Sequence, residues 1–166
     1  MIIKNARVFT EDGSFMQGDV VVKDGRFDSV LERTADTDAA NDSESQEIID
    51  ASGLIMIPGL VDIHFHGAVG YDFCQASKEE LLKIAEYEAK NGVLAICPAT
   101  MSYNEEILGH VMDKAADYKE DTGADLVGIN MEGPFINLKK AGAQNPEYIM
   151  PADKELSLIH ISEPTR

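Results

Sequence analysis

His64 and His66, separated by a single residue, are the residues of this chain best suited to hold a metal ion. They end an apolar segment typical of a β-strand, residues 60–66, in which successive side chains point to opposite faces. The spacing predicts that Asp62 shares one polar face with both histidines and that Gly67 ends the strand. The opposite face would carry the apolar side chains of Val61, Ile63 and Phe65 toward covering helices. Spacing alone equally allows a half-buried strand with two solvated histidines.

A carboxylate at the end of a later strand supplies a third candidate ligand. Glu132 follows an apolar segment, residues 126–131, and a Gly-Pro pair stops the strand directly after it. Alternation predicts one face with Leu126, Gly128, Asn130 and Glu132, and a helix-covered face with Val127, Ile129 and Met131. The carboxyl ends of barrel strands meet at one rim, so Glu132 is expected near the histidine pair. Imidazole and carboxylate together suit Zn²⁺ or Fe²⁺, whereas a lone glutamate there would be a solvated residue.

Two predicted helices lie between these strands. The first opens with the capping box Ser77-Lys78-Glu79-Glu80 and ends at Asn91-Gly92. The second opens within residues 102–105 and ends near Thr122-Gly123, and a continuous apolar strand, residues 93–97, separates the two. Their buried stripes would be Leu81, Ile84, Ala85 and Ala89, and Ile107, Leu108, Val111, Met112 and Ala115. Alternating strands and helices predict right-handed crossovers and a parallel sheet, so the fold class is α/β.

The first 57 residues have a different pattern, typical of a small all-β module. Short strands are predicted over residues 2–9, 19–22, 26–31, 47–50 and 54–57. Asp24-Gly25 supplies the positive φ angles of a two-residue hairpin turn. Residues 34–47 are acidic and carry no apolar side chain larger than alanine, so we expect a solvated surface loop.

The composition indicates which classes of partner and which cellular compartment to expect. A net charge of −16 and a pI near 4.4 argue against nucleic acid or an anionic membrane as partner. Cys74 and Cys97 form no disulfide framework, and the start of the chain lacks the apolar core of a signal peptide, so a cytoplasmic protein is expected. The longest apolar stretch, residues 54–63, is interrupted and far shorter than the ~20 residues of a membrane span.

Two motifs carry a resemblance to a known family. IIDASGL at residues 48–54, running into PGLVDIHFHG at residues 58–67, resembles the amidohydrolase superfamily. MEGPFIN at residues 131–137, followed by KKAGAQ at residues 139–144, is similar to N-acetylglucosamine-6-phosphate deacetylases. The resemblance implies a (β/α)₈ TIM barrel beside a β-sandwich built from both chain termini. Residues 1–57 would then form part of the sandwich and residues 58–155 the first three βα units, while residues 156–166 depart from the family and resemble adaptor-derived read-through.

The resemblance also implies roles for individual residues. Glu132 matches the carboxylate metal ligand, and His64 and His66 match the pair that binds a second ion in members that keep it. One or two divalent ions, zinc or iron, are therefore expected as cofactor. Ala143 and Gln144 match positions that touch the sugar. Two further histidine ligands and the aspartate that acts as general acid and base would lie beyond Arg166.

The implied reaction is hydrolysis of N-acetylglucosamine 6-phosphate to glucosamine 6-phosphate and acetate, in a full-length protein that is a homo-oligomer. The 166 residues alone would be inactive. Asp62 would either orient a histidine ligand or be a polar residue of the barrel interior. Two alternatives stay open: another amidohydrolase, dihydroorotase-like or deaminase-like, and a non-catalytic truncated remnant.

Overall fold

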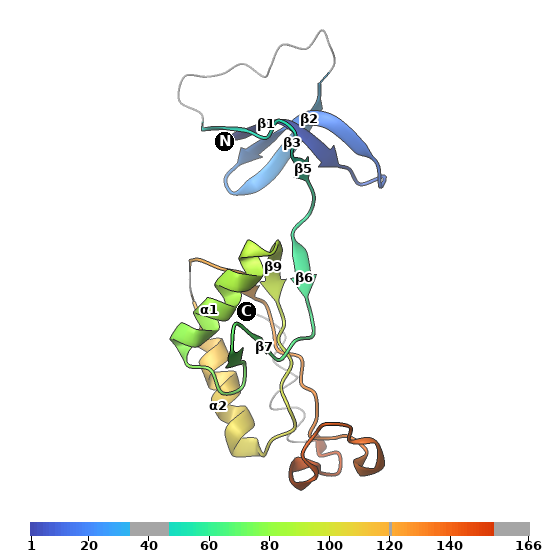
Figure 1. The fold of residues 1–166 in the computed structure, drawn as a ribbon, viewed down its shortest axis with the longest axis vertical. Helices are drawn as coiled ribbons and strands as arrows, with labels where there is room; N and C mark the ends of the chain where they lie inside the picture. The colour runs from blue at the N-terminus through green and yellow to red at the C-terminus, as the bar shows by residue number, and fades with distance from the viewer. Residues whose placement is uncertain (34–46, 120, 155–166) are drawn as a thin grey trace. The chain divides into compact units, whose positions relative to one another are not determined.

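The computed structural model describes residues 1–33, 47–119 and 121–154, which form two compact units. The first unit comprises residues 1–58 and the second begins at Gly59. Figure 1 shows the chain coloured from its N-terminus to its C-terminus. Most of the acidic segment and the whole of the divergent tail lie outside the described residues, so the expectations for them stay predictions.

The first unit is a five-stranded sheet. Its strands are β1 (Ile2–Phe9), β2 (Phe15–Lys23), β3 (Arg26–Glu32), β4 (Ile48–Asp50) and β5 (Ile55–Met56). The first three form an antiparallel meander, and β4 and β5 both pair in parallel with β1. Asp24 and Gly25 adopt φ angles of 51° and 70°, which confirms the predicted two-residue turn. The described residues supply one layer only, so the second layer of the implied sandwich stays a prediction.

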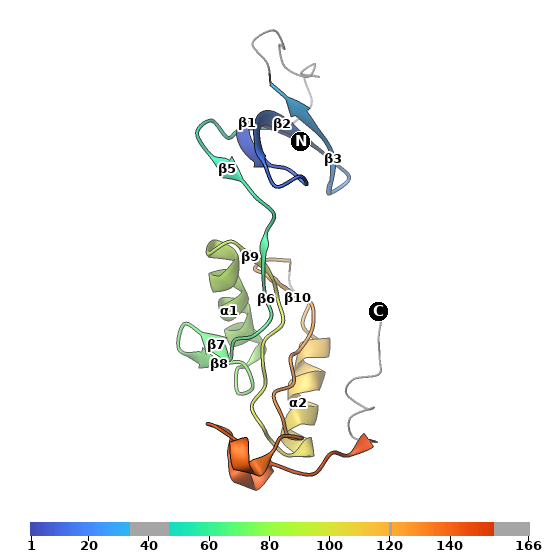
Figure 2. The same ribbon diagram turned by 90° about the vertical axis from the view of Figure 1, so that its right-hand side faces the viewer.

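The second unit contains a parallel three-stranded sheet with the order β10-β9-β6. Its strands are β6 (Leu60–Asp62), β9 (Val93–Ile96) and β10 (Asp125–Leu126), and α1 (Lys78–Lys90) and α2 (Glu105–Ala116) follow β6 and β9. Figures 1 and 2 show α1 alongside β9. The predicted βα alternation is therefore confirmed, but the described strands do not close a barrel.

Short elements complete the second unit. β7 (Gly67–Ala68) and β8 (Tyr71–Asp72) form a small antiparallel pair, and two 3₁₀ turns cover Leu138–Lys140 and Pro146–Tyr148. Gly67 therefore begins a hairpin, and β6 ends earlier than predicted, at Asp62. No helix among the described residues is long and apolar enough to cross a bilayer.

The two helices differ in how well their ends were predicted. Ser77 caps α1 as expected: its side chain accepts a hydrogen bond from Glu80 N–H, and the Glu80 side chain accepts one from Ser77 N–H. For α2, the cap is Asn104, which accepts from Ile107 N–H, and the helix ends at Ala116. The predicted opening within residues 102–105 is confirmed, whereas the predicted end near Thr122-Gly123 is wrong, because the helix stops earlier. Ser102 is not the cap: it is buried, and its N–H donates to the Gln144 side chain at 2.6 Å.

Two apolar clusters form the core of the second unit, and the first of them joins the two helices. One joins Phe73, Leu81 of α1 and Val111 of α2, and the other joins Ala85 of α1 to Ile96 and Ala124. A single cation reinforces the first cluster: Lys114 Nζ donates to the backbone carbonyls of Phe73 at 2.9 Å, Cys74 at 3.3 Å and Ala76 at 2.7 Å. The ammonium thus ties α2 to the segment that precedes α1.

Replacing Lys114 with methionine is expected to lower the free energy of unfolding by about 2 kcal/mol, because three carbonyls lose a charged donor. Urea unfolding followed by circular dichroism measures the change. Lys139→Met, at an exposed position, is the matched control and should leave the midpoint unaltered. Equal effects of the two substitutions would contradict this role for Lys114.

Candidate metal centre

One extra residue in the chain after β6 sets the direction of the histidines. Cys97 N–H donates to Asp62 C=O and Ala99 N–H donates to Phe65 C=O, both at 2.7 Å. The chain after β6 thus advances three residues while the chain after β9 advances two, as in a β-bulge. The alternation of faces restarts between Asp62 and Phe65. His64 and His66 therefore share a face, as predicted, but Asp62 does not share it.

The helix-facing side of β6 is correspondingly different from the prediction. Asp62 pairs with Ile96, which is fully buried against Ala85 of α1. Val61 and Ile63 are 58% and 65% exposed, so they do not lie beneath a helix. Phe65 alone of the predicted apolar face packs against this cluster. The prediction failed because it assumed an uninterrupted alternation through residue 66.

A second extra residue follows β10 on the other side of the central strand. Val127 N–H donates to Ile96 C=O at 3.0 Å and Asn130 N–H donates to Pro98 C=O at 2.9 Å. Again three residues of the outer chain lie beside two of the central chain. Pro98 has no N–H to continue the regular ladder, which provides a physical cause for the irregularity.

This irregularity reverses two of the predicted orientations. Leu126 packs into the helix-side clusters and Val127 is 64% exposed, the opposite of the prediction. Ile129 packs toward the helices as predicted. Asn130 and Glu132 lie on the side of the histidines, as predicted, because the phase is restored before residue 130.

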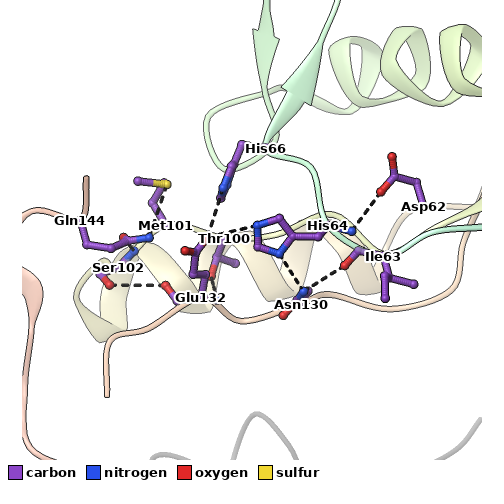
Figure 3. Close-up of polar contacts among 10 residues, drawn as sticks. All are labelled: Asp62, Ile63, His64, His66, Thr100, Met101, Ser102, Asn130, Glu132 and Gln144. Atoms are coloured by element: carbon purple, nitrogen blue, oxygen red, sulfur yellow. Dashed lines mark hydrogen bonds and ion pairs between the residues drawn. The ribbon is translucent and has the colours of Figure 1, made fainter. Parts of the chain in front are cut away.

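His64, His66 and Glu132 converge at the carboxyl ends of the strands. Glu132 Oε2 lies 3.1 Å from His66 Nε2 and 3.5 Å from His64 Nε2. The imidazole rings meet edge to face with their centroids 5.3 Å apart. One potential ligand atom from each residue lies within 4.8 Å of the others. Figure 3 shows the three side chains turned toward one another and Asp62 pointing away.

The donor set fits a cation. Glu132 Oε2 and His66 Nδ1 are buried atoms without a hydrogen-bond partner among the described residues. A buried carboxylate oxygen without a hydrogen bond is costly unless a charge compensates it. Two imidazole nitrogens and a carboxylate oxygen form the mixed set that Zn²⁺ or Fe²⁺ accepts. The group therefore has the chemistry expected of a metal site and, in Glu132 Oε2, an unsatisfied oxygen that a cation would compensate.

The backbone of Glu132 is fixed by the segment that follows β9. Its N–H donates to Thr100 Oγ1 at 3.2 Å, and its carbonyl accepts from Ser102 Oγ at 3.4 Å. Thr100 and Ser102 are both buried. Hydrogen bonds to both the N–H and the carbonyl of Glu132 thus hold the backbone that carries the carboxylate. Sequence reasoning missed this role because hydroxyl residues in an apparent loop give no periodic signal.

Gln144 and Ala143, the predicted sugar contacts, lie in different environments. The Gln144 side chain is buried: its Oε1 accepts from Ser102 N–H at 2.6 Å, and its Nε2 lies 3.8 Å from Met101 Sδ. Ala143 is exposed. In this structure Gln144 therefore braces the segment that holds Glu132. Contact of either residue with a sugar stays a prediction.

Asp62 acts on the helix side of the sheet. Its Oδ1 accepts a hydrogen bond from the backbone N–H of His64 at 3.0 Å, so it fixes the main chain and does not touch the ring nitrogens. Burial, followed by the charge of Asp62, raises the pKa of Glu88, a buried residue of α1. The predicted alternative of a polar residue inside the barrel is wrong for the same geometric reason.

Replacing Glu88 with glutamine is expected to raise the thermal unfolding midpoint at pH 7. At low pH this carboxyl is protonated in the folded and in the unfolded chain, so it does not affect stability. As the pH rises, the unfolded chain loses its proton first because the pKa is higher in the folded state, and the unfolded state is thereby favoured. The gain should therefore disappear as the pH falls to the ordinary carboxyl range near 4. Thermal scans at both pH values measure this difference, with the exposed Glu147→Gln as control. A gain of equal size at pH 4 would contradict the explanation.

Known proteins resemble this chain over nearly its whole length. An N-acetylglucosamine-6-phosphate deacetylase of Bacillus subtilis (strain 168) is 31% identical over 161 residues, 94% of this chain and 39% of that protein. The crystal structure of the Thermotoga maritima N-acetylglucosamine-6-phosphate deacetylase superposes with a TM-score of 0.77 at 28% identity, covering 97% of this chain and 39% of the other.

A third relative shares the fold at lower sequence identity. A Mycobacterium smegmatis N-acetyl-D-glucosamine-6-phosphate deacetylase mutant, solved in complex with N-acetyl-D-glucosamine-6-phosphate, has a TM-score of 0.75 at 19% identity. It covers 98% of this chain and 40% of that structure, and at this identity it shows the fold alone. No protein-family model matches the sequence. The chain thus spans about 39% of the length of the relatives it matches.

Proposed function

Because the chain belongs with the N-acetylglucosamine-6-phosphate deacetylase-like amidohydrolases, we propose that it supplies part of the metal site of such an enzyme. The reaction would be hydrolysis of N-acetylglucosamine 6-phosphate to glucosamine 6-phosphate and acetate. The observation that carries the proposal is the convergence of His64, His66 and Glu132, with ligand atoms within 4.8 Å of one another. The names of the Bacillus subtilis and Thermotoga maritima relatives, both N-acetylglucosamine-6-phosphate deacetylases, support this choice of substrate.

In this proposal the residues of the chain act as metal ligands, and another residue transfers the proton. Glu132 and the two histidines would hold one or two divalent ions, zinc or iron. A bound ion of this kind polarises an amide carbonyl and lowers the pKa of a bound water to about 7. Glu132 serves as ligand and does not transfer the proton, because its carboxylate is directed between the imidazoles. The proton would move through an aspartate that the resemblance places beyond Arg166.

Substrate binding would require cationic groups from outside the described residues. The net charge of −16 opposes the approach of a sugar phosphate, so local cations must hold the phosphate. We propose that they come from the rest of a longer protein or from a second subunit of a homo-oligomer. Gln144 would contact the sugar only if its segment rearranges, since its amide is bound to Ser102 in this structure, whereas Ala143 is exposed.

The 166-residue chain by itself is proposed to bind metal without turning over substrate. Three ligand residues gather in the described part of the chain, and the aspartate that moves the proton is not among them. The test is acetate release from N-acetylglucosamine 6-phosphate by the purified chain loaded with Zn²⁺ or Fe²⁺. No release above the rate without protein is expected. Turnover at an enzymatic rate would refute the proposal that the chain needs further residues.

The rival amidohydrolase activities are tested with a longer protein that carries this sequence. We expect acetate release from N-acetylglucosamine 6-phosphate and no hydrolysis of cyclic amides such as dihydroorotate or deamination of nucleobases. The opposite pattern would favour the dihydroorotase-like or deaminase-like alternative. A chain that binds no metal at all would favour the non-catalytic remnant.

A further inference from the structure

The orientation of the Asn130 side chain is set by the backbone of the β6 segment. Asn130 Nδ2 lies 2.9 Å from the carbonyl oxygen of Ile63. A carbonyl oxygen only accepts hydrogen bonds, so the nitrogen of the amide must face it, and the amide oxygen cannot. Figure 3 shows this amide between Ile63 and His64. The backbone thus decides which end of the amide meets the neighbouring imidazole.

The same amide nitrogen decides the tautomer of His64. It lies 3.2 Å from His64 Nδ1. An amide nitrogen donates and does not accept, so Nδ1 must be the acceptor of this contact. In the neutral ring the proton then resides on Nε2, the atom that faces Glu132 Oε2 at 3.5 Å. The two hydrogens of one amide group serve two acceptors.

This tautomer is the wrong one for a metal on Nε2. A metal-ligating histidine uses an unprotonated nitrogen and donates the N–H of its other nitrogen to an acceptor. If His64 bound a cation through Nε2, its proton would move to Nδ1 and meet the N–H of Asn130. His66 has no such opposition, because its Nδ1 has no hydrogen-bond partner among the described residues.

We propose that Asn130 holds His64 in the Nε2–H tautomer and thereby makes it the weakest of the three metal ligands. Glu132 and His66 would take the cation first. His64 would join only when the Asn130 amide turns away and gives up its bond to Ile63. The second step rests on the proposed metal site, whereas the tautomer itself does not.

The first test needs no variant and no metal. Long-range ¹H–¹⁵N NMR of the metal-free chain, at a pH where imidazoles are neutral, distinguishes the two histidine tautomers. We expect His64 to show the Nε2–H pattern. A predominant Nδ1–H pattern would overturn the proposal, whether or not the chain binds metal. Failure of the proposed function would show itself separately, as absence of metal binding.

The second test measures the consequence for affinity. Asn130→Leu removes the donor without adding charge. Metal should then bind about fivefold more tightly, the affinity ratio that corresponds to one net hydrogen bond. Visible absorption measures the binding of Co²⁺, and calorimetry measures the binding of Zn²⁺. A residue that merely positions His64 would give weaker binding on substitution, and that result would overturn the proposal. In a His64→Ala background the Asn130→Leu effect should vanish, and a persisting effect would also refute the role.

Discussion

Replacing Glu132 with glutamine is expected to weaken metal binding by the chain by at least about 100-fold. Loss of a group that only supports a metal ligand already costs about 10- to 100-fold in affinity, and Glu132 is the shared centre of this site. Its Oε2 is the atom that both imidazoles approach, at 3.1 Å and 3.5 Å. Glutamine keeps the shape and removes the charge, so the change isolates the electrostatic contribution. Metal content after dialysis and calorimetric titration with Zn²⁺ measure the loss.

The matched control for this charge is Glu147→Gln. Glu147 is exposed in a 3₁₀ turn, where its carboxylate accepts a hydrogen bond from Asn145 Nδ2 and its N–H donates to Asn145 Oδ1. Its substitution removes the same charge from the same chain, so metal affinity should be unaffected. His66→Ala should give a loss intermediate between the two. Unchanged metal stoichiometry in Glu132→Gln would show that the ion, if any, binds elsewhere.

Local signals in the sequence predicted the local structure well. The Ser77-to-Glu80 capping box and the Asp24-Gly25 turn were confirmed because each depends on a few neighbouring residues. The approach of Glu132 to the histidine pair was also foreseen, because the ends of parallel strands must meet at one edge of the sheet. These predictions needed no knowledge of how the strands are hydrogen-bonded.

The errors in strand orientation share one cause, the loss of strand phase. Period-two alternation was carried through residues 60–66 and 126–131, but an extra residue interrupts each outer chain beside the central one. Asp62 and Leu126 therefore face the helices, and Val61 and Val127 do not. Pro98, without an N–H, was a readable sign of an irregular ladder on one side. Nothing in the sequence marks the irregularity on the other side.

The two irregularities also explain how the site is assembled. Each neighbour of the central chain contains one additional residue, between Asp62 and Phe65 on one side and between Val127 and Asn130 on the other. Beyond these positions His64 and His66 meet Glu132 across the central chain. Bulges next to active sites commonly re-aim side chains in this way. The geometry of the site therefore depends on the hydrogen-bonding pattern between the strands as well as on the ligand residues.

Replacing Gly133 with alanine is expected to lower the free energy of unfolding by about 3 kcal/mol or more and to impair metal binding. Gly133 has φ of 94°, and a Cβ there would lie 2.0 Å from Ser102 Oγ and 3.3 Å from Ser102 Cα. An L-residue in the left-handed region costs about 1–2 kcal/mol, and displacing a buried neighbour adds about 1–3 kcal/mol. Ser102 is buried and its hydroxyl binds the Glu132 carbonyl, so the clash should shift the ligand itself.

Gly142→Ala separates the backbone cost from the clash. Gly142 also has a positive φ, 62°, but a Cβ there would meet nothing within 4 Å. This control should cost only the backbone term, about 1–2 kcal/mol, and should leave Zn²⁺ affinity unchanged. Urea unfolding and calorimetric titration of both variants give the comparison. If Gly133→Ala lost no more stability than Gly142→Ala and kept its metal affinity, then close packing of Ser102 against Gly133 could not be what holds Glu132 in place.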